Sequence, residues 1–200
     1  MPAAIPPDAR SGPHSDARVE PTDDTCGRLH GMTGDETDVE ARVLAALNAS
    51  GEPFEIVDCD PALADTAAFC AAYGYSPDNS ANTIVAIGKS DPPTFVACIA
   101  LATTRLDING VVRRRLEVRK ASFAPSADTA AITGMQIGGV TPFALPSTIP
   151  IWVDGEVTRR EQLILGGGSR SIKVLCPPRT LLAMPSVTVV EGLATQVAPQ

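Results

Sequence analysis

The segment Ile132 to Pro146, ITGMQIGGVTPFALP, most constrains how this chain folds. Gly138 and Gly139 are adjacent, and Pro142 follows three residues later. Glycine raises the entropic cost of ordering the backbone and proline removes a backbone donor, so a buried helix or strand is a poor use of this segment. Two interpretations remain equally open: a sharp structural turn, or a loop whose backbone N–H groups bind a carbonyl or oxyanion.

A second glycine-rich segment, Gly166 to Lys173, has the sequence GGGSRSIK. It ends in a lysine after a glycine run, but it lacks both the glycine before the lysine and the Ser or Thr after it that a nucleotide-binding P-loop needs. The segment is either a flexible connection between strands or a place where backbone N–H groups, a hydroxyl and a guanidinium hold a polar or anionic group.

Secondary-structure patterns begin at residue 37 with a capping box at Thr37 to Glu40, and helices come early while strands cluster late. Aromatic residues make up only 4% of the chain, so the core must consist of Val, Ile, Leu and Ala. The order of elements predicts a single α/β domain of α+β character, with a largely antiparallel sheet packed against helices. The predicted helices cover about 37–50, 61–73, 107–116, 126–132 and 178–183, and the predicted strands cover 54–57, 83–87, 94–101, 121–123, 149–153, 162–165, 171–175 and 187–190.

The two ends of the chain differ from the middle in composition and in apolar periodicity. Residues 1–36 are rich in Pro, Asp, Gly, Ser and Thr without apolar periodicity, which predicts a disordered tail, with a folded domain over 37–194 and a short tail at 195–200. The start of the chain lacks the basic and apolar parts of a signal peptide, and no apolar run has the length of a membrane span. We therefore expect a cytoplasmic protein without a membrane partner.

Charge limits the class of nucleic acid that the chain can bind. The net charge is −7, and beyond residue 36 the chain is nearly balanced. Proteins that bind long duplexes are usually basic, so we expect no DNA partner, while recognition of a short single-stranded end stays open. The basic cluster Arg113, Arg114, Arg115, Arg119 and Lys120 is either a solvated helix end or a contact for phosphates.

Several ordinary catalytic chemistries have no support in the sequence. The only histidines, His14 and His30, lie in the predicted tail, and the five cysteines form no CxxC pair, so we expect reduced thiols, no metal site and no cofactor. Cys176 is favoured as a structural thiol over a nucleophile, because no histidine is available to activate it. Asp154 and Glu156 are favoured as a hairpin tip over a catalytic pair.

Three features together resemble the YbaK/ProX type of aminoacyl-tRNA deacylase, which also occurs as the editing domain of bacterial prolyl-tRNA synthetases. Thr133 to Phe143 (TGMQIGGVTPF) is similar to the family's TGxxxGGvsPf segment and contains its GxxxP loop. Gly168 to Lys173 is similar to its GSRxxK segment, and Asn82 to Val85 stands where the family has a KTLv strand. The order of elements over about residues 38–193 also follows the family.

The resemblance implies hydrolysis of the ester that joins a wrongly attached amino acid, with a small side chain, to the 3′ end of tRNA. The implied partners are the aminoacyl-tRNA 3′ end and, as a further candidate, prolyl-tRNA synthetase. The ribose hydroxyl of the terminal adenosine helps to activate the attacking water, and no cofactor is implied. The implied catalytic positions are Asn82, Gly138, Gly139 and Ser169, and the implied substrate-binding positions are Val140, Thr141, Pro142, Phe143, Gly168, Arg170 and Lys173.

The sequence departs from the family at the position of its lysine. Asn82 stands there, and a neutral amide can hydrogen-bond a phosphate or ribose oxygen without neutralising charge. Cys59 and Asp60 replace a histidine that often follows the first strand, and Thr180 stands near the place of an acidic residue. The alternative to a trans-editing hydrolase is therefore a weakened or inactive module that binds an aminoacyl or tRNA end, or a protein partner.

Overall fold

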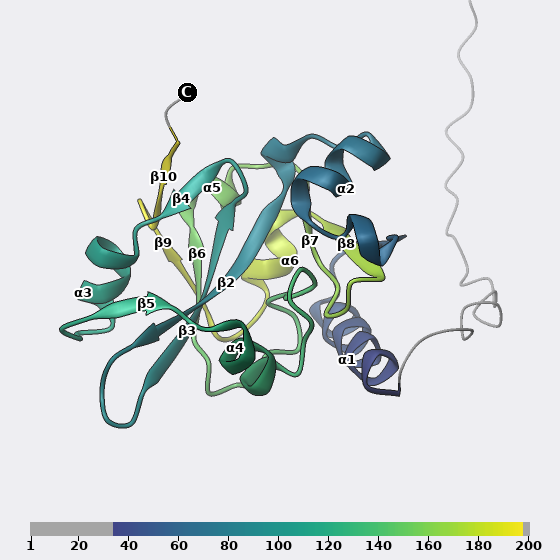
Figure 1. Cartoon of the computed structure of the whole chain (residues 1–200). Helices are drawn as coiled ribbons and strands as arrows, with labels where there is room; N and C mark the ends of the chain where they lie inside the picture. Colours follow the sequence, from purple (N-terminus) through teal and green to yellow (C-terminus); the bar gives the residue numbers. More distant parts are fainter. Residues whose placement is uncertain (1–33, 198–200) are drawn as a thin grey trace, which may run out of the picture. The chain divides into compact units, whose positions relative to one another are not determined.

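The computed structural model describes residues 34–197, and within this range the chain forms a mixed α/β domain (Figure 1). Its largest sheet has the strand order β5-β2-β3-β6-β9. β2 pairs antiparallel with β3 and β5, while β3–β6 and β6–β9 are parallel ladders. The strands of this sheet are β2 (Ala81–Gly88), β3 (Thr94–Leu101), β5 (Ala121–Phe123), β6 (Ile151–Asp154) and β9 (Val187–Val190).

A second sheet has the order β1-β8-β7, and both of its ladders are antiparallel. It comprises β1 (Glu55–Asp58), β7 (Leu163–Gly166) and β8 (Ile172–Cys176). An isolated parallel bridge between Ser80 and Ile164 holds the beginning of β2 against β7. The third sheet pairs β4 (Thr104–Leu106) with β10 (Ala194–Gln196). The expectation of a largely antiparallel arrangement with helices is therefore confirmed.

Helices cover the sheets and join the strands. α1 (Gly34–Ser50) and α6 (Pro178–Leu182) lie beside the β1-β8-β7 sheet, and α2 (Thr66–Tyr73) lies over the beginning of β2 (Figure 1). The others are η2 (Pro61–Leu63), η3 (Pro77–Asn79), η4 (Ile108–Val112), α3 (Arg113–Arg115), α4 (Ser126–Thr133) and α5 (Gly155–Thr158). In the described part of the chain, none of these helices has the length and apolar character needed to cross a membrane.

Three local predictions differ from the structure. α1 begins at Gly34, so Thr37 lies inside the helix instead of capping it. The turn predicted at Asp154 is the start of α5, because the buried Asp154 carboxylate accepts from the Glu156 N–H at 3.0 Å and from the Ala194 N–H at 2.9 Å. The helix predicted over 107–116 begins as a π-helical turn capped by Asp107.

Most of the predicted N-terminal tail, residues 1–33 with both histidines and Cys26, lies outside the described residues. At the other end, the predicted C-terminal tail begins at residue 195, whereas β10 continues to Gln196.

The core is aliphatic, as the composition predicts. The largest buried cluster lies between the two larger sheets and α1, and includes Val43, Leu47, Ile99, Ile151 and Leu163. Burial of such side chains contributes about 25 cal/mol per Å² of apolar surface, which makes this cluster the main source of stability. It also fixes β2 relative to β7, and a cavity opens beside that contact.

Candidate functional site

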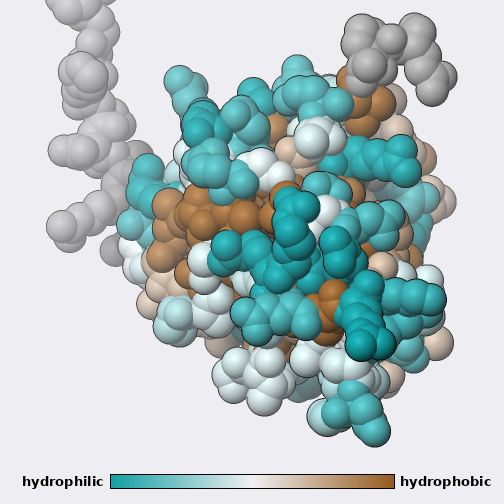
Figure 2. All heavy atoms as spheres, turned by 90° about the vertical axis from the view of Figure 1, so that its left-hand side faces the viewer, coloured by the Kyte–Doolittle hydropathy of each residue, from teal (hydrophilic) through white to brown (hydrophobic). Residues whose placement is uncertain are grey.

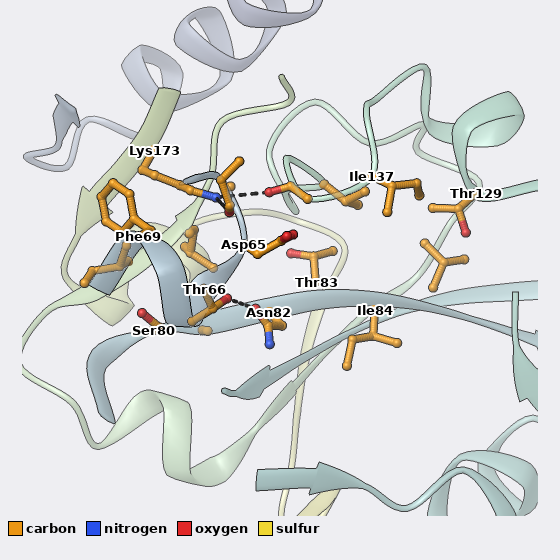
Figure 3. Close-up of a pocket in the computed structure, with 18 of the residues that line it drawn as sticks. Asp65, Thr66, Phe69, Ser80, Asn82, Thr83, Ile84, Thr129, Ile137 and Lys173 are labelled. Atoms are coloured by element: carbon orange, nitrogen blue, oxygen red, sulfur yellow. Dashed lines mark hydrogen bonds between the residues drawn. The ribbon is translucent and has the colours of Figure 1, made fainter. Parts of the chain in front are cut away.

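A cavity of about 500 Å³ opens between β2, β7, the beginning of α2 and the loop that follows α4 (Figure 3). The loop contributes Ile137, Gly138 and Val140 to one wall, with Lys173 of β8 beside them. Asn82, Thr83 and Ile84 of β2 form the opposite wall, and Asp65, Thr66 and Phe69 close one end. This volume is sufficient for a small organic group, which is within the range of ordinary ligand sites.

Gly138 adopts a backbone conformation that only glycine takes without strain, with φ of +92°. A side chain at this position would also overlap the guanidinium of Arg170 and approach Asp65 Oδ1 to 3.5 Å. The Arg170 guanidinium holds the loop in return, because Nη1 donates to the Ile137 carbonyl at 3.1 Å. The loop therefore presents main chain to the cavity at this point.

The two glycine-rich segments of the sequence contact each other beside the cavity through their backbone atoms. A side chain on Gly139 would overlap the carbonyl group of Ser169, and one on Gly166 would overlap the carbonyl oxygens of Gly139 and Val140. The Gly168 N–H donates to the Gly139 carbonyl at 2.7 Å and the Gln136 N–H donates to the Gly168 carbonyl at 3.1 Å. The motifs thus form one unit, in which the β7–β8 connection supports the loop that lines the cavity.

Lys173 connects this unit to α2. Its side chain is 6% exposed, and Nζ donates to the carbonyl of Ala64 at 2.6 Å and to that of Gly138 at 3.0 Å (Figure 3). Burial lowers the pKa of the Lys173 ammonium from its usual value, and the nearby Arg170 lowers it further, while Cys59 and Asp65 oppose the shift. The ammonium supplies positive charge at the wall and holds the glycine loop close to Ala64, two residues before α2.

Asn82 faces the cavity from β2, and its orientation is set by Thr66. The Thr66 hydroxyl donates to Asn82 Oδ1 at 2.9 Å, so the carbonyl end of the amide is occupied. Within residues 34–197, the Asn82 amide nitrogen has no hydrogen-bond acceptor, which leaves it available to a ligand oxygen. Its neighbour Thr83 has a buried hydroxyl without a hydrogen-bond partner in the described part of the chain, and it lines the same cavity.

Among the described residues that line the cavity, Asp65 is the one with an acidic side chain. Its carboxylate lies 3.6 Å from Arg170 Nη1, and it is 76% exposed. It stands just before α2 without accepting a capping bond from that helix, and Figure 3 shows it between Lys173 and Thr83. Sequence analysis missed Asp65, Thr66 and Thr83, although the Asp-Thr start of an alanine-rich helix indicates the location of two of them.

The structure divides the sequence-predicted site residues into two groups. Asn82, Gly138, Val140 and Lys173 line the cavity. Ser169 does not: it is buried, its hydroxyl donates to Glu40 of α1, and it accepts from the Ser171 N–H at 3.0 Å. The remaining predicted residues support the loop without lining the cavity, and they are Gly139, Thr141, Pro142, Phe143, Gly168 and Arg170.

The described cysteines are free and buried. Burial raises the pKa of the Cys98 and Cys176 thiols to about 12, so both stay protonated near neutral pH and are poor nucleophiles. Among residues 34–197, no group of three His, Cys, Asp or Glu side chains is arranged to hold a metal ion. The cavity offers instead an amide, hydroxyls, a carboxylate, an ammonium and main chain.

Comparison with known structures finds the same fold. The hypothetical protein APE2540 has a TM-score of 0.66 and 23% identity, over 74% of this chain and 97% of that one. A structure described as a trans-editing enzyme proposed for prolyl tRNA synthetase also has a TM-score of 0.66, with 20% identity over 76% of this chain and 95% of that one. No curated protein sequence matches this chain significantly.

The model of one protein family matches residues 60–183, a range that spans both glycine-rich segments, β2 and α2. Its description is "Aminoacyl-tRNA editing domain". The match covers more than half of the chain and includes every residue that lines the cavity. The chain therefore belongs to the family of aminoacyl-tRNA editing domains.

Proposed function

We propose that this protein is a trans-editing deacylase, which hydrolyses the ester between a wrongly attached small amino acid and the 3′ adenosine of tRNA. One observation carries the proposal: the GxxxP loop presents its main chain to a cavity whose opposite wall offers a free amide and an unpartnered hydroxyl. A cytoplasmic location and prolyl-tRNA synthetase as a partner belong to the same proposal.

The proposed reaction uses water as the nucleophile. Water attacks the ester carbonyl, the ribose oxygen leaves and takes a proton, and the products are a free amino acid and tRNA. The terminal ribose hydroxyl helps to activate the water, so the protein needs no histidine base. The ammonium of Lys173 and the main chain of the loop stabilise the negative charge that develops on the carbonyl oxygen.

Binding of the substrate uses both walls. The aminoacyl group lies against Ile137, Gly138 and Val140, and the size of the cavity favours a small side chain. The exposed Asp65 carboxylate attracts the positively charged α-ammonium group of the aminoacyl ester. Asn82 and Thr83 hydrogen-bond oxygens of the terminal nucleoside.

The second candidate function is a binding module of the same fold that holds the aminoacyl end without hydrolysis. The neutral Asn82 favours it, since an amide cannot neutralise a phosphate or a developing negative charge. Both candidates predict the same ligand and differ in whether the ester is cut.

A deacylation assay separates the two candidates. Purified protein is incubated with a panel of mischarged tRNAs, and loss of the ester is followed for the wild type and for Asn82→Lys and Gly138→Ala. The hydrolase predicts loss of at least one ester with the wild type, and a rate at least tenfold lower for Gly138→Ala. Gly192→Ala is the matched control, because Gly192 has φ of +67° with open space around it.

Two results decide against the proposal. If the wild type leaves every ester intact and Asn82→Lys gains activity, the binding module replaces the hydrolase. If Gly138→Ala keeps the full rate in an active protein, the loop is not part of the substrate site.

A further inference from the structure

An exposed aromatic side chain stands between the main cavity and a second one. Phe123, at the end of the edge strand β5, is 55% exposed. It lines the main cavity, and it also lines a cavity of about 460 Å³ formed by β4, η4, β5 and β10. An aromatic ring that is half exposed on the ridge between two hollows leaves apolar surface in contact with water.

The segment that leads to Phe123 is rich in basic side chains. Residues 105–120 hold six basic and two acidic side chains, in a chain whose net charge is −7. Arg105 lines the second cavity, and Arg114, Arg119 and Lys120 are exposed. No acidic side chain in the described part of the chain forms an ion pair with any of these four residues.

The two acidic side chains of this segment offset only two of its six positive charges. The Asp107 carboxylate is directed into η4, where it accepts from the N–H groups of Gly110 at 2.8 Å and Val111 at 3.2 Å. Glu117 lies on the exposed turn after α3. Figure 2 views the side of the molecule that carries α3 and β5, where hydrophilic side chains lie next to hydrophobic areas.

We propose that this ridge binds the single-stranded nucleotides that precede the terminal adenosine of the acceptor end. Phe123 stacks on one base, and Arg105 with the basic residues of the α3–β5 segment contacts phosphates. The inference deepens the proposed function, on which it rests. If the terminal adenosine is held in the main cavity, the RNA strand joined to it must pass over the edge of this cavity, and Phe123 lies at that edge. Alternating aromatic and basic contacts are how proteins bind single strands.

Binding of a short fluorescein-labelled RNA that ends in CCA, followed by anisotropy, tests the stacking contact. We expect Phe123→Ala to weaken the affinity about tenfold, as loss of one base–aromatic stack does, and Phe123→Tyr to keep most of it. Leu182→Ala is the control, because Leu182 is 45% exposed on α6 and belongs to neither cavity. Equal affinities for the wild type and Phe123→Ala, or an equal loss in Leu182→Ala, would overturn the inference.

Salt dependence tests the phosphate contacts. The slope of log K against log[salt] should fall by about 1.4 in the double variant Arg114→Gln, Arg119→Gln, since each single-strand phosphate contact contributes about 0.7. Arg42→Gln on α1, whose side chain is paired with Asp38, should leave the slope unchanged. An unchanged slope in the double variant would remove these residues from the site. Both readouts are independent of ester hydrolysis, so a wild type that binds RNA and cuts no ester refutes the proposed hydrolase alone.

Discussion

The two walls of the main cavity differ in whether main chain or side chains face the ligand space. The loop wall consists of main chain held by close backbone contacts, as at Gly139 against Ser169, and by Lys173. The β2 wall consists of side chains, and its central residue Asn82 is positioned by a single hydrogen bond from Thr66. A backbone wall tolerates almost no substitution, whereas a side-chain wall can exchange one residue for another without loss of the fold. Under the proposed function both walls are needed, and the β2 wall is where a substitution can alter hydrolysis without loss of the fold.

The largest expected effect lies in the loop wall. Gly139→Ala places a methyl group on the Ser169 carbonyl, and backbone atoms cannot give way as a flexible side chain does. We expect the free energy of unfolding, measured with urea, to fall by about 3 kcal/mol. Gly192→Ala, with left-handed φ but open space, should cost only about 1 kcal/mol. Equal losses in the two variants would mean that the overlap with Ser169 costs no more than a left-handed backbone conformation in open space.

An intermediate effect is expected at Lys173, which joins the loop to Ala64, two residues before α2. Lys173→Met leaves the carbonyls of Ala64 and Gly138 without their donor, and we expect a loss of about 1 to 2 kcal/mol in the free energy of unfolding at neutral pH.

The same variant makes a prediction about pH. The folded-state pKa of Lys173 is lowered by burial, so between this value and 10.5 the unfolded chain binds more protons than the folded one. The free energy of unfolding of the wild type should therefore rise with pH through this window, relative to Lys173→Met. Parallel pH profiles for the two proteins would contradict the lowered pKa.

The smallest effect is expected in the β2 wall. Thr66→Val removes the donor to Asn82 Oδ1, and we expect a loss of about 1 kcal/mol or less in stability. The deacylation rate, or the affinity of the binding module, should fall by a few-fold because the amide is free to turn. Thr158→Val removes a comparable hydroxyl bond, to the Gly155 carbonyl in α5, and should leave the ligand unaffected. A similar change in function for both variants would mean that Thr66 does not position Asn82.

Sequence reasoning was most accurate where the backbone itself carries the information. Both glycine-rich segments could be recognised because positions such as Gly138 and Gly139 exclude all other residues. The antiparallel pair β2 and β3 followed from two apolar runs joined by a short turn. The contact between the two glycine segments could not be predicted from local patterns, because β6 and α5 separate the segments in sequence and they meet only in the folded chain.

The side-chain wall shows why the rest was not predictable. Ser169 looked like a ligand contact because a hydroxyl follows glycines, but the fold turns it toward Glu40 of α1. Asp65 belongs to no motif, and Thr83 lies in the segment similar to the KTLv strand without being marked there as a site residue, so the place of both at the cavity depends on tertiary structure. Asp154 was assigned to a turn from local chemistry alone, whereas its second bond, to the Ala194 N–H, lies far along the chain.

The most direct test of the central claim, that both walls hold one aminoacyl nucleoside, is an NMR titration of amide resonances with a non-hydrolysable alanyl-adenosine in which an amide replaces the ester. The account predicts saturable shifts of the Gly138 and Val140 amides together with those of Asn82 and Thr83, with one common dissociation constant. Shifts confined to one wall, or none at either wall at ligand concentrations up to the millimolar range, would contradict it.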